Sequence, residues 1–210
     1  PLTPIQLIID NLNSKFLENI DEDKKIKYKE NLNTILKQIK QIENLVNEFS
    51  DFARMPKPLI KKNNLNKLIK ENIELVSSFD KSIKINLTNY LSKDVIINFD
   101  YEQFNRMFFN LIKNSLESIQ EKAQKTNEFD KNINIEITQR NDYIIINLLD
   151  TGLGFEKERI KDLIKPYFTT KQKGTGLGLS IVDKIISDHN GSIKFLNHKN
   201  GAKVEIVISN

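Results

Sequence analysis

The chain has 210 residues, 39% of them apolar, which is enough for one or two domains with a real core. It has no cysteine, which excludes disulfides, thiol catalysis and cysteine-bound zinc, and no apolar run resembles a membrane span or a signal peptide. Its net charge of +4 comes mostly from scattered lysines, so we expect no nucleic-acid partner. The absence of cysteine fits a reducing compartment, and we expect a cytoplasmic location for this stretch.

The first 55 residues predict two helices joined by a polar break. Residues 1–20 and 24–53 both carry apolar side chains at helical spacing. In the second segment these side chains alternate by three and four, as in a heptad seam, at Leu32, Ile35, Ile39, Ile42, Val46 and Phe49. Leu36, Leu45 and Phe52 widen the face, so we expect two hairpins to pair as a homodimeric four-helix bundle. The alternative is a hairpin that packs within one chain.

A domain boundary is predicted at Pro56 and Pro58, because neither proline can continue a helix. Residues 1–55 then form one domain and residues 56–210 a second. In the second domain helices are predicted at 65–78, 101–122 and 180–187, and strands at 59–62, 82–87, 94–99, 133–138, 143–149, 192–196 and 203–208. Several strands follow one another directly, so the predicted class is α+β with helices on one face of a largely antiparallel sheet.

Two glycine-rich runs organise the second domain. Asp150-Thr151-Gly152-Leu153-Gly154 follows a predicted strand, and Gly174-Thr175-Gly176-Leu177-Gly178-Leu179-Ser180 leads into a predicted helix. Glycine lets a ligand approach the backbone closely, and the N–H groups of a helix start bind phosphate. A carboxylate such as that of Asp150 accepts a hydrogen bond from an exocyclic amine. Either run alone is usually a simple turn, but the two together predict a nucleotide pocket in which Asp150 selects adenine.

The long helix at 101–122 carries two asparagines, Asn110 and Asn114, one turn apart on the same face. An amide oxygen is a neutral, hard ligand that suits a Mg²⁺ ion shared with phosphates. Asparagine is a poor helix former, so two on one face call for a reason. The alternative is that they merely decorate a helix in an asparagine-rich chain.

Residues 155–173 predict a loop that closes over the pocket, since long loops in compact domains are often lids. Lys171 and Lys173 would reach phosphates from this lid, and surface solvation is the alternative explanation for either lysine. The two histidines, His189 and His198, lie in turn-like surroundings, and we expect neither to be functional.

Together these motifs resemble the ATP-binding domain of sensor histidine kinases, which is related to the ATP folds of Hsp90, gyrase and MutL. Residues 48–56, Glu-Phe-Ser-Asp-Phe-Ala-Arg-Met-Pro, resemble NtrY-type nitrogen-regulation kinases in particular. The resemblance covers nearly the whole chain. It implies an α/β-sandwich ATP domain at 56–210 and a dimerisation and histidine-phosphotransfer hairpin at 1–55.

The resemblance also implies the site. Asn114 would ligate Mg²⁺, with Asn110 and Lys113 as candidate catalytic residues on the same helix. The implied ATP-binding residues are Asn114, Asp150, Gly152, Gly154, Phe168, Thr169, Thr170, Lys171, Lys173, Gly174, Thr175, Gly176, Leu177, Gly178 and Leu179.

The implied activity is transfer of the γ-phosphoryl group of ATP to a histidine and then to an aspartate of a response-regulator receiver domain. In the resembled family that histidine lies just upstream of a segment like Pro1–Leu7, so this stretch lacks the phosphoacceptor. The parent protein could also be anchored in the inner membrane through upstream segments. Two alternatives stay open: an ATP hydrolase of the gyrase or MutL kind, and a non-catalytic dimerising adaptor. Asn110 stands where such a hydrolase needs a carboxylate base, which argues against hydrolysis.

Overall fold

The computed structural model describes residues 3–16, 22–126, 128–171 and 174–209. The chain divides into two compact units, Pro1–Met55 and Pro56–Asn210. Each unit is considered by itself.

The first unit is a pair of helices, α1 (Thr3–Phe16) and α2 (Glu22–Ala53). Ile9 of α1 packs with Leu32 and Ile39 of α2 in a small buried cluster. With 14 and 32 residues at ~1.5 Å rise each, α1 is about 21 Å long and α2 about 48 Å, so α1 covers less than half of α2. Most of the predicted seam therefore stays exposed within one chain, namely Ile35, Ile42, Val46 and Phe49.

The second unit is built on a five-stranded sheet in the order β2-β4-β5-β7-β6. Its strands are β2 (Lys84–Asn89), β4 (Asn132–Arg140), β5 (Tyr143–Asp150), β6 (Ser192–His198) and β7 (Gly201–Ser209). Three of its four pairings are antiparallel, and β2 runs parallel to β4. Between β4 and β5 the chain reverses at Asn141, whose φ is +54°, a conformation that asparagine tolerates well.

A separate two-stranded sheet pairs β1 (Lys61–Asn64) with β3 (Ile96–Phe99). The sequence indicated one sheet, so this division corrects the expected layout. Alternation identifies each strand but not its partner, because pairing depends on contacts between distant segments.

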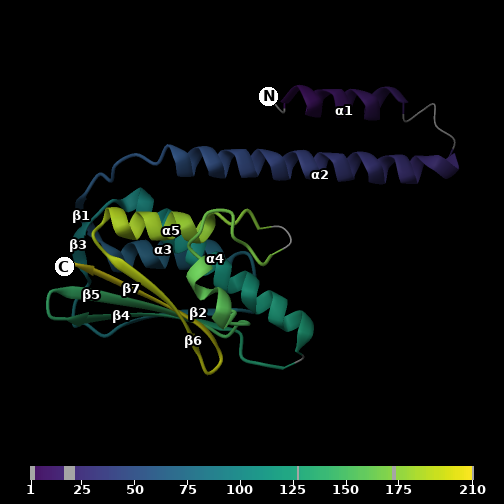
Figure 1. Ribbon diagram of the computed structural model, residues 1–210. Helices are drawn as coiled ribbons and strands as arrows, with labels where there is room; N and C mark the ends of the chain where they lie inside the picture. Colours follow the sequence, from purple (N-terminus) through teal and green to yellow (C-terminus); the bar gives the residue numbers. More distant parts are fainter. Residues whose placement is uncertain (1–2, 17–21, 127, 172–173, 210) are drawn as a thin grey trace. The chain divides into compact units, whose positions relative to one another are not determined.

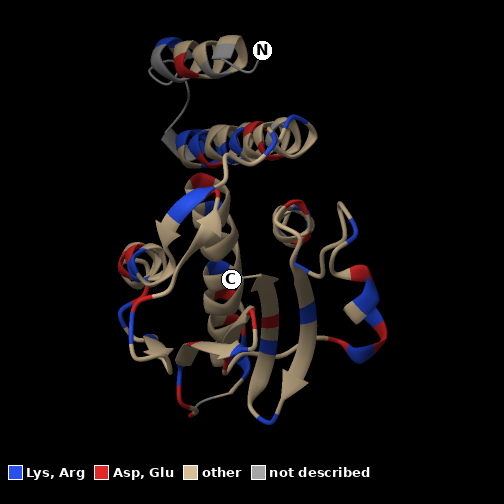
Figure 2. Ribbon diagram, turned by 90° about the vertical axis from the view of Figure 1, so that its left-hand side faces the viewer, with Lys and Arg blue, Asp and Glu red and all other residues tan. Residues whose placement is uncertain are grey.

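Three helices cover one face of the main sheet: α3 (Leu65–Ser77), α4 (Tyr101–Lys125) and α5 (Gly178–Asp188) (Figure 1). Their apolar faces and the inner face of the sheet form the core, with Phe104, Phe108, Ile112, Ile135, Ile146 and Ile181 almost fully buried. A short 3₁₀ helix, η2 (Lys157–Asp162), lies in the predicted lid. Basic and acidic residues are interspersed along the helices and strands of this unit (Figure 2).

Candidate functional site

The two asparagines of α4 face the start of α5. A Cβ atom built on Gly178, the first residue of α5, would lie 3.4 Å from Asn110 Oδ1 and 3.9 Å from Asn114 Nδ2. Asn110 also donates from Nδ2 to the carbonyl oxygen of Arg106, at 3.0 Å. The helical spacing thus places both amides on one face, and that face meets the second glycine-rich run.

In the described part of the chain, the N-cap position of α5 provides no side-chain hydrogen bond to the helix start. This N-cap residue, Leu177, is buried. A helix start carries unsatisfied N–H groups and the positive end of the helix dipole. Because this start lies beside Asn110 and Asn114, an anionic group bound here would also lie near their amides.

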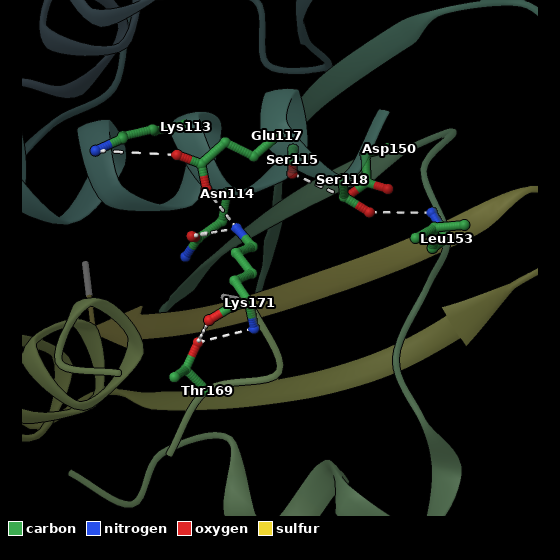
Figure 3. A network of polar contacts seen from close by, with 9 residues as sticks. All are labelled: Lys113, Asn114, Ser115, Glu117, Ser118, Asp150, Leu153, Thr169 and Lys171. Atoms are coloured by element: carbon green, nitrogen blue, oxygen red, sulfur yellow. Dashed lines mark hydrogen bonds and ion pairs between the residues drawn. The ribbon is translucent and has the colours of Figure 1, made fainter. Parts of the chain in front are cut away.

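Lys171 reaches from the predicted lid to α4 (Figure 3). Its Nζ donates to Asn114 Oδ1 at 3.2 Å and forms an ion pair with Glu117 Oε2 at 2.5 Å. Glu117 also faces Lys113, with 4.0 Å between Lys113 Nζ and Glu117 Oε1. The Lys171 ammonium therefore occupies a cation position between an amide oxygen and a carboxylate.

The Asp150 carboxylate is buried at the end of β5 and accepts three hydrogen bonds. Oδ2 accepts from Ser115 Oγ at 2.8 Å, and Oδ1 accepts from the N–H groups of Gly152 and Ala202 at 2.9 and 3.3 Å. An ionised carboxylate offers about four acceptor positions, so about one is left for a ligand. Ser115 follows Asn114 directly on α4, which brings the Asp150 side chain and the cation position to one helix.

Two glycines in the runs cannot carry a side chain without disturbing the site. Gly176 has a φ of +71°, and a Cβ there would lie 2.5 Å from the carbonyl carbon of Tyr167. A Cβ at Gly152 would lie 2.3 Å from Ser118 Oγ, which accepts a hydrogen bond from Leu153 N–H. Both positions thus need glycine, for backbone conformation at one and for close packing at the other.

The other residues predicted to bind ATP lie within the predicted lid or in the two glycine-rich runs that flank it. Thr169 Oγ1 accepts from Lys171 N–H at 3.1 Å, and a Cβ at Gly174 would lie 2.5 Å from that same oxygen. Half-buried Phe168 follows Tyr167 at the turn beside Gly176, while Thr170 is exposed. Gly154 precedes Phe155, whose N–H donates to Asn197 Oδ1. Thr175 Oγ1 accepts a hydrogen bond from Leu177 N–H, and Leu179 lies in the first turn of α5. Lys173 lies outside the described residues.

The family description "Histidine kinase-, DNA gyrase B-, and HSP90-like ATPase" matches residues 99–210, which is more than half of the chain. The chain belongs to this ATPase family. The matched range contains α4, both glycine-rich runs and the lid, so the site described above lies within the family domain.

Known relatives and solved structures are similar to this chain over more of its length than the family model. The chain is 32% identical to nitrogen regulation protein NtrY of Azorhizobium caulinodans over 92% of its own length, and spans a quarter of that protein. The catalytic domain of histidine kinase ThkA is 26% identical, with a TM-score of 0.62 over 71% of this chain and 95% of that one. ThkA in complex with response regulator TrrA is similar in fold, at 22% identity and a TM-score of 0.71, over 99% of this chain and 58% of that one.

These findings confirm the resemblance to NtrY-type sensor histidine kinases and the predicted fold class, a helical pair followed by an α/β sandwich. In the described part of the chain no helix is both long and apolar enough to cross a membrane.

The structure of this ATPase-family domain adds residues that the sequence did not single out. Ser115 and Glu117 contact Asp150 and Lys171 respectively, across 35 and 54 residues of chain. A signal for Ser115 existed, since it is a small polar residue on the apolar face of α4. Nothing in the sequence distinguished Glu117 from the other charged residues of that helix.

Both histidines are bound to the backbone. His189 Nε2 accepts from Asp100 N–H at 3.0 Å, and its Nδ1 lies 2.7 Å from the Ile185 carbonyl oxygen. His198 Nε2 lies 2.9 Å from the Asp150 carbonyl oxygen. Their rings thus hold neighbouring elements together within the domain.

The residues present fit a nucleotide with a divalent cation. The Lys171 ammonium contacts Asn114 Oδ1 and Glu117 Oε2 and so occupies a place where a metal cation could bind. Amide and carboxylate oxygens are the ligand atoms that Mg²⁺ prefers. The start of α5 supplies N–H groups suited to phosphate, and Asp150 supplies an acceptor suited to an amine.

Proposed function

We propose that residues 56–210 bind ATP together with Mg²⁺ and supply its γ-phosphoryl group to a histidine, in a two-component signalling system. The observation that carries this proposal is the Lys171 ammonium at Asn114, beside the uncapped start of α5. The Lys171 ammonium lies where a divalent cation that accompanies the anionic nucleotide would be held.

Each residue has a defined part in this proposal. Asp150 would accept a hydrogen bond from the exocyclic amine of adenine, Asn114 would hold Mg²⁺, and the N–H groups at the start of α5 would bind phosphate oxygens. Mg²⁺, when bound, neutralises charge that develops on the transferred group. Lys171 would exchange its contact with Asn114 for one with a phosphate, and the glycines would let the nucleotide approach the backbone. Catalysis then rests on positioning and charge neutralisation.

The roles given to Asn110 and Lys113 are secondary. Asn110 lies beside Gly178 and orients the phosphate end, while exposed Lys113 keeps Glu117 in place from the neighbouring turn. Phe168, Thr169 and Thr170 belong to the lid that covers the nucleotide, and Lys173 adds a second lid cation. Gly152, Gly154, Gly174, Thr175, Leu177 and Leu179 shape the backbone around it.

Further partners follow from the same proposal. The helical unit 1–55 would form a homodimeric bundle through the exposed face of α2, supported by the four exposed apolar side chains of its predicted seam. A response-regulator receiver domain would accept the phosphoryl group from the histidine. Support comes from the fold likeness to ThkA, which was solved with a response regulator. The parent protein would act in nitrogen regulation, with this part on the cytoplasmic side of an inner membrane.

Hydrolysis of ATP is the less favoured activity. Asn110 is an amide, and its Nδ2 is bound to its own helix, so it supplies no base. The nearby carboxylate, Glu117, is paired with Lys171. An adaptor without catalysis would not need the Asn114, Lys171 and α5 arrangement.

Calorimetric titration of the intact chain tests the proposal. ATP and ADP should bind with Mg²⁺ and much more weakly with EDTA, and GTP should bind far more weakly than ATP. Asn114→Ala should remove the effect of Mg²⁺, while Asn134→Ala, at an exposed position of β4, should leave it unchanged. Absence of nucleotide binding by the folded chain would overturn the proposal.

A further inference from the structure

Lys122 lies near the C-terminal end of α4, and its ammonium group donates hydrogen bonds to three backbone carbonyl oxygens. Its Nζ donates to the oxygens of Thr151 at 2.8 Å, Gly152 at 3.1 Å and Asn200 at 3.0 Å. The ring centroid of Phe129 lies 4.7 Å from the same nitrogen. An ammonium group has three protons, so every donor of Lys122 is used, and an aromatic face provides a fourth favourable contact.

These carbonyls belong to two turns that are far apart in the sequence. Thr151 and Gly152 form the turn after β5, whereas Asn200 lies in the turn between β6 and β7. Lys122 is therefore a single cation that ties both turns to α4. The carbonyl dipoles converge on one point, where they would repel one another without a positive charge.

The same two turns hold the Asp150 carboxylate. Its Oδ1 accepts one hydrogen bond from Gly152 N–H, in the first turn, and one from Ala202 N–H, just after the second. The backbone here is tightly packed, since a Cβ on Gly201 would lie 2.3 Å from the Asp150 carbonyl oxygen. A small displacement of either turn would therefore change the direction of the carboxylate.

We propose that Lys122 is a positioning residue for adenine recognition: its ammonium fixes the turns at Gly152 and Asn200 so that the remaining acceptor position of Asp150 faces the base. The assignment of adenine to Asp150 rests on the proposed function. Lys122 itself does not touch the nucleotide.

The test compares Lys122→Met, which keeps most of the apolar stem and removes the charge, with Lys125→Met. Lys125 is exposed on the next turn of α4 and pairs only with Glu121 in the contacts described, at 2.7 Å. Lys122→Met should weaken Mg-ATP binding about tenfold, as expected when a charge-assisted contact set is lost, and Lys125→Met should not.

Amide hydrogen exchange of the nucleotide-free protein provides an independent readout. The N–H groups of Gly152 and Ala202 should exchange faster in Lys122→Met than in the unmodified chain, while amides in the middle of β4 should not change. Unaltered exchange at both positions would overturn the proposal, whether or not the unmodified chain binds ATP. Absence of ATP binding by the unmodified chain would instead overturn the proposed function.

Chemical rescue separates charge from packing. In Lys122→Ala, ammonium or methylammonium ions should restore ATP affinity, whereas tetramethylammonium at equal ionic strength should not. Faster exchange at Gly152 and Ala202 with unchanged ATP affinity would show that the turns are held for stability alone, which contradicts the role in adenine recognition.

Discussion

At the scale of single residues, the site depends on charges whose partners are distant in the sequence. Asp150 illustrates this most clearly, because its buried carboxylate accepts hydrogen bonds from Ser115, Gly152 and Ala202.

Asp150→Asn replaces an acceptor by a group that is partly a donor. We expect ATP affinity to fall by about 2 kcal/mol and the preference for ATP over GTP to shrink. Calorimetry with both nucleotides measures this, with Asp142→Asn in an exposed turn as the control. An unchanged ATP-to-GTP ratio would show that Asp150 does not select the base.

A second residue-scale prediction concerns Glu117. If Lys171 must leave Glu117 to bind phosphate, the ion pair competes with the nucleotide. Both side chains are about one-third exposed, so solvent screens the pair and its contribution is about 0.5–1 kcal/mol. Glu117→Gln should therefore tighten Mg-ATP binding a few-fold at low salt, with a smaller gain at high salt.

Glu121→Gln is the matched control for that measurement, since Glu121 lies one turn later and pairs with exposed Lys125. Weaker binding in Glu117→Gln, together with a loss of Mg²⁺ dependence, would mean that Glu117 serves the metal and not Lys171.

At the scale of elements, Asp80 joins the turn between α3 and β2 to α4. Its carboxylate accepts from the N–H and hydroxyl of Ser82 and from Gln120 Nε2, and these hydrogen bonds lower the pKa of Asp80 below its ordinary value. A carboxyl group with a lowered folded-state pKa stabilises the fold above its unfolded pKa, near 3.8, and loses this contribution as the pH falls through the folded value.

Asp80→Asn should accordingly lower the thermal midpoint by about 2–4 °C at pH 7, because a partly exposed charged hydrogen-bond set contributes roughly 1 kcal/mol. The difference from the unmodified chain should narrow as the pH falls below the unfolded value of 3.8, because the folded carboxyl group then becomes protonated as well. Thermal unfolding followed by circular dichroism at several pH values measures both effects. A difference that does not narrow at any pH below 3.8 would rule out the ionised carboxylate as its source.

At the scale of the whole molecule, the exposed apolar face of α2 predicts self-association. Ile42 is 49% exposed, whereas Ile39 is 6% exposed and belongs to the core of the helix pair. Ile42→Glu should therefore convert a dimer into monomers without unfolding the helices, and Ile39→Glu should also lower helicity. Sedimentation at micromolar concentration distinguishes the two states, with Gln41→Glu on an exposed neighbouring position as the charge control. A monomeric unmodified chain would contradict the bundle.

The two histidines of this chain should not accept the phosphoryl group of ATP. His189 and His198 are held by backbone groups, so this chain should not label itself on histidine with radioactive ATP. Transfer requires an acceptor nitrogen in line with the γ-phosphorus. A partner that carries the phosphoacceptor histidine, but is disabled at its own asparagine-bearing helix, should be labelled in a mixed dimer. The same mixture with Asn114→Ala in this chain should give no label, and acid-labile label on this chain alone would contradict the prediction.

The sequence by itself determined the elements and the family. Helical periodicity located α4 almost to its end, and alternation located the strands. Glycine runs beside an asparagine-bearing helix were enough to indicate a nucleotide pocket. All of these signals are local, because periodicity, capping and turn chemistry act over a few residues.

Only the tertiary structure decided which residues meet. The pairing of β2 parallel to β4, the separate β1–β3 sheet and the ion pair of Lys171 with Glu117 all join segments tens of residues apart. The Lys122 ammonium likewise reaches carbonyls 29, 30 and 78 residues away. A lysine or glutamate on a helix surface looks the same in the sequence whether it faces water or a carbonyl cluster. Its partner is fixed only when packing of the apolar core brings distant turns to the same helix.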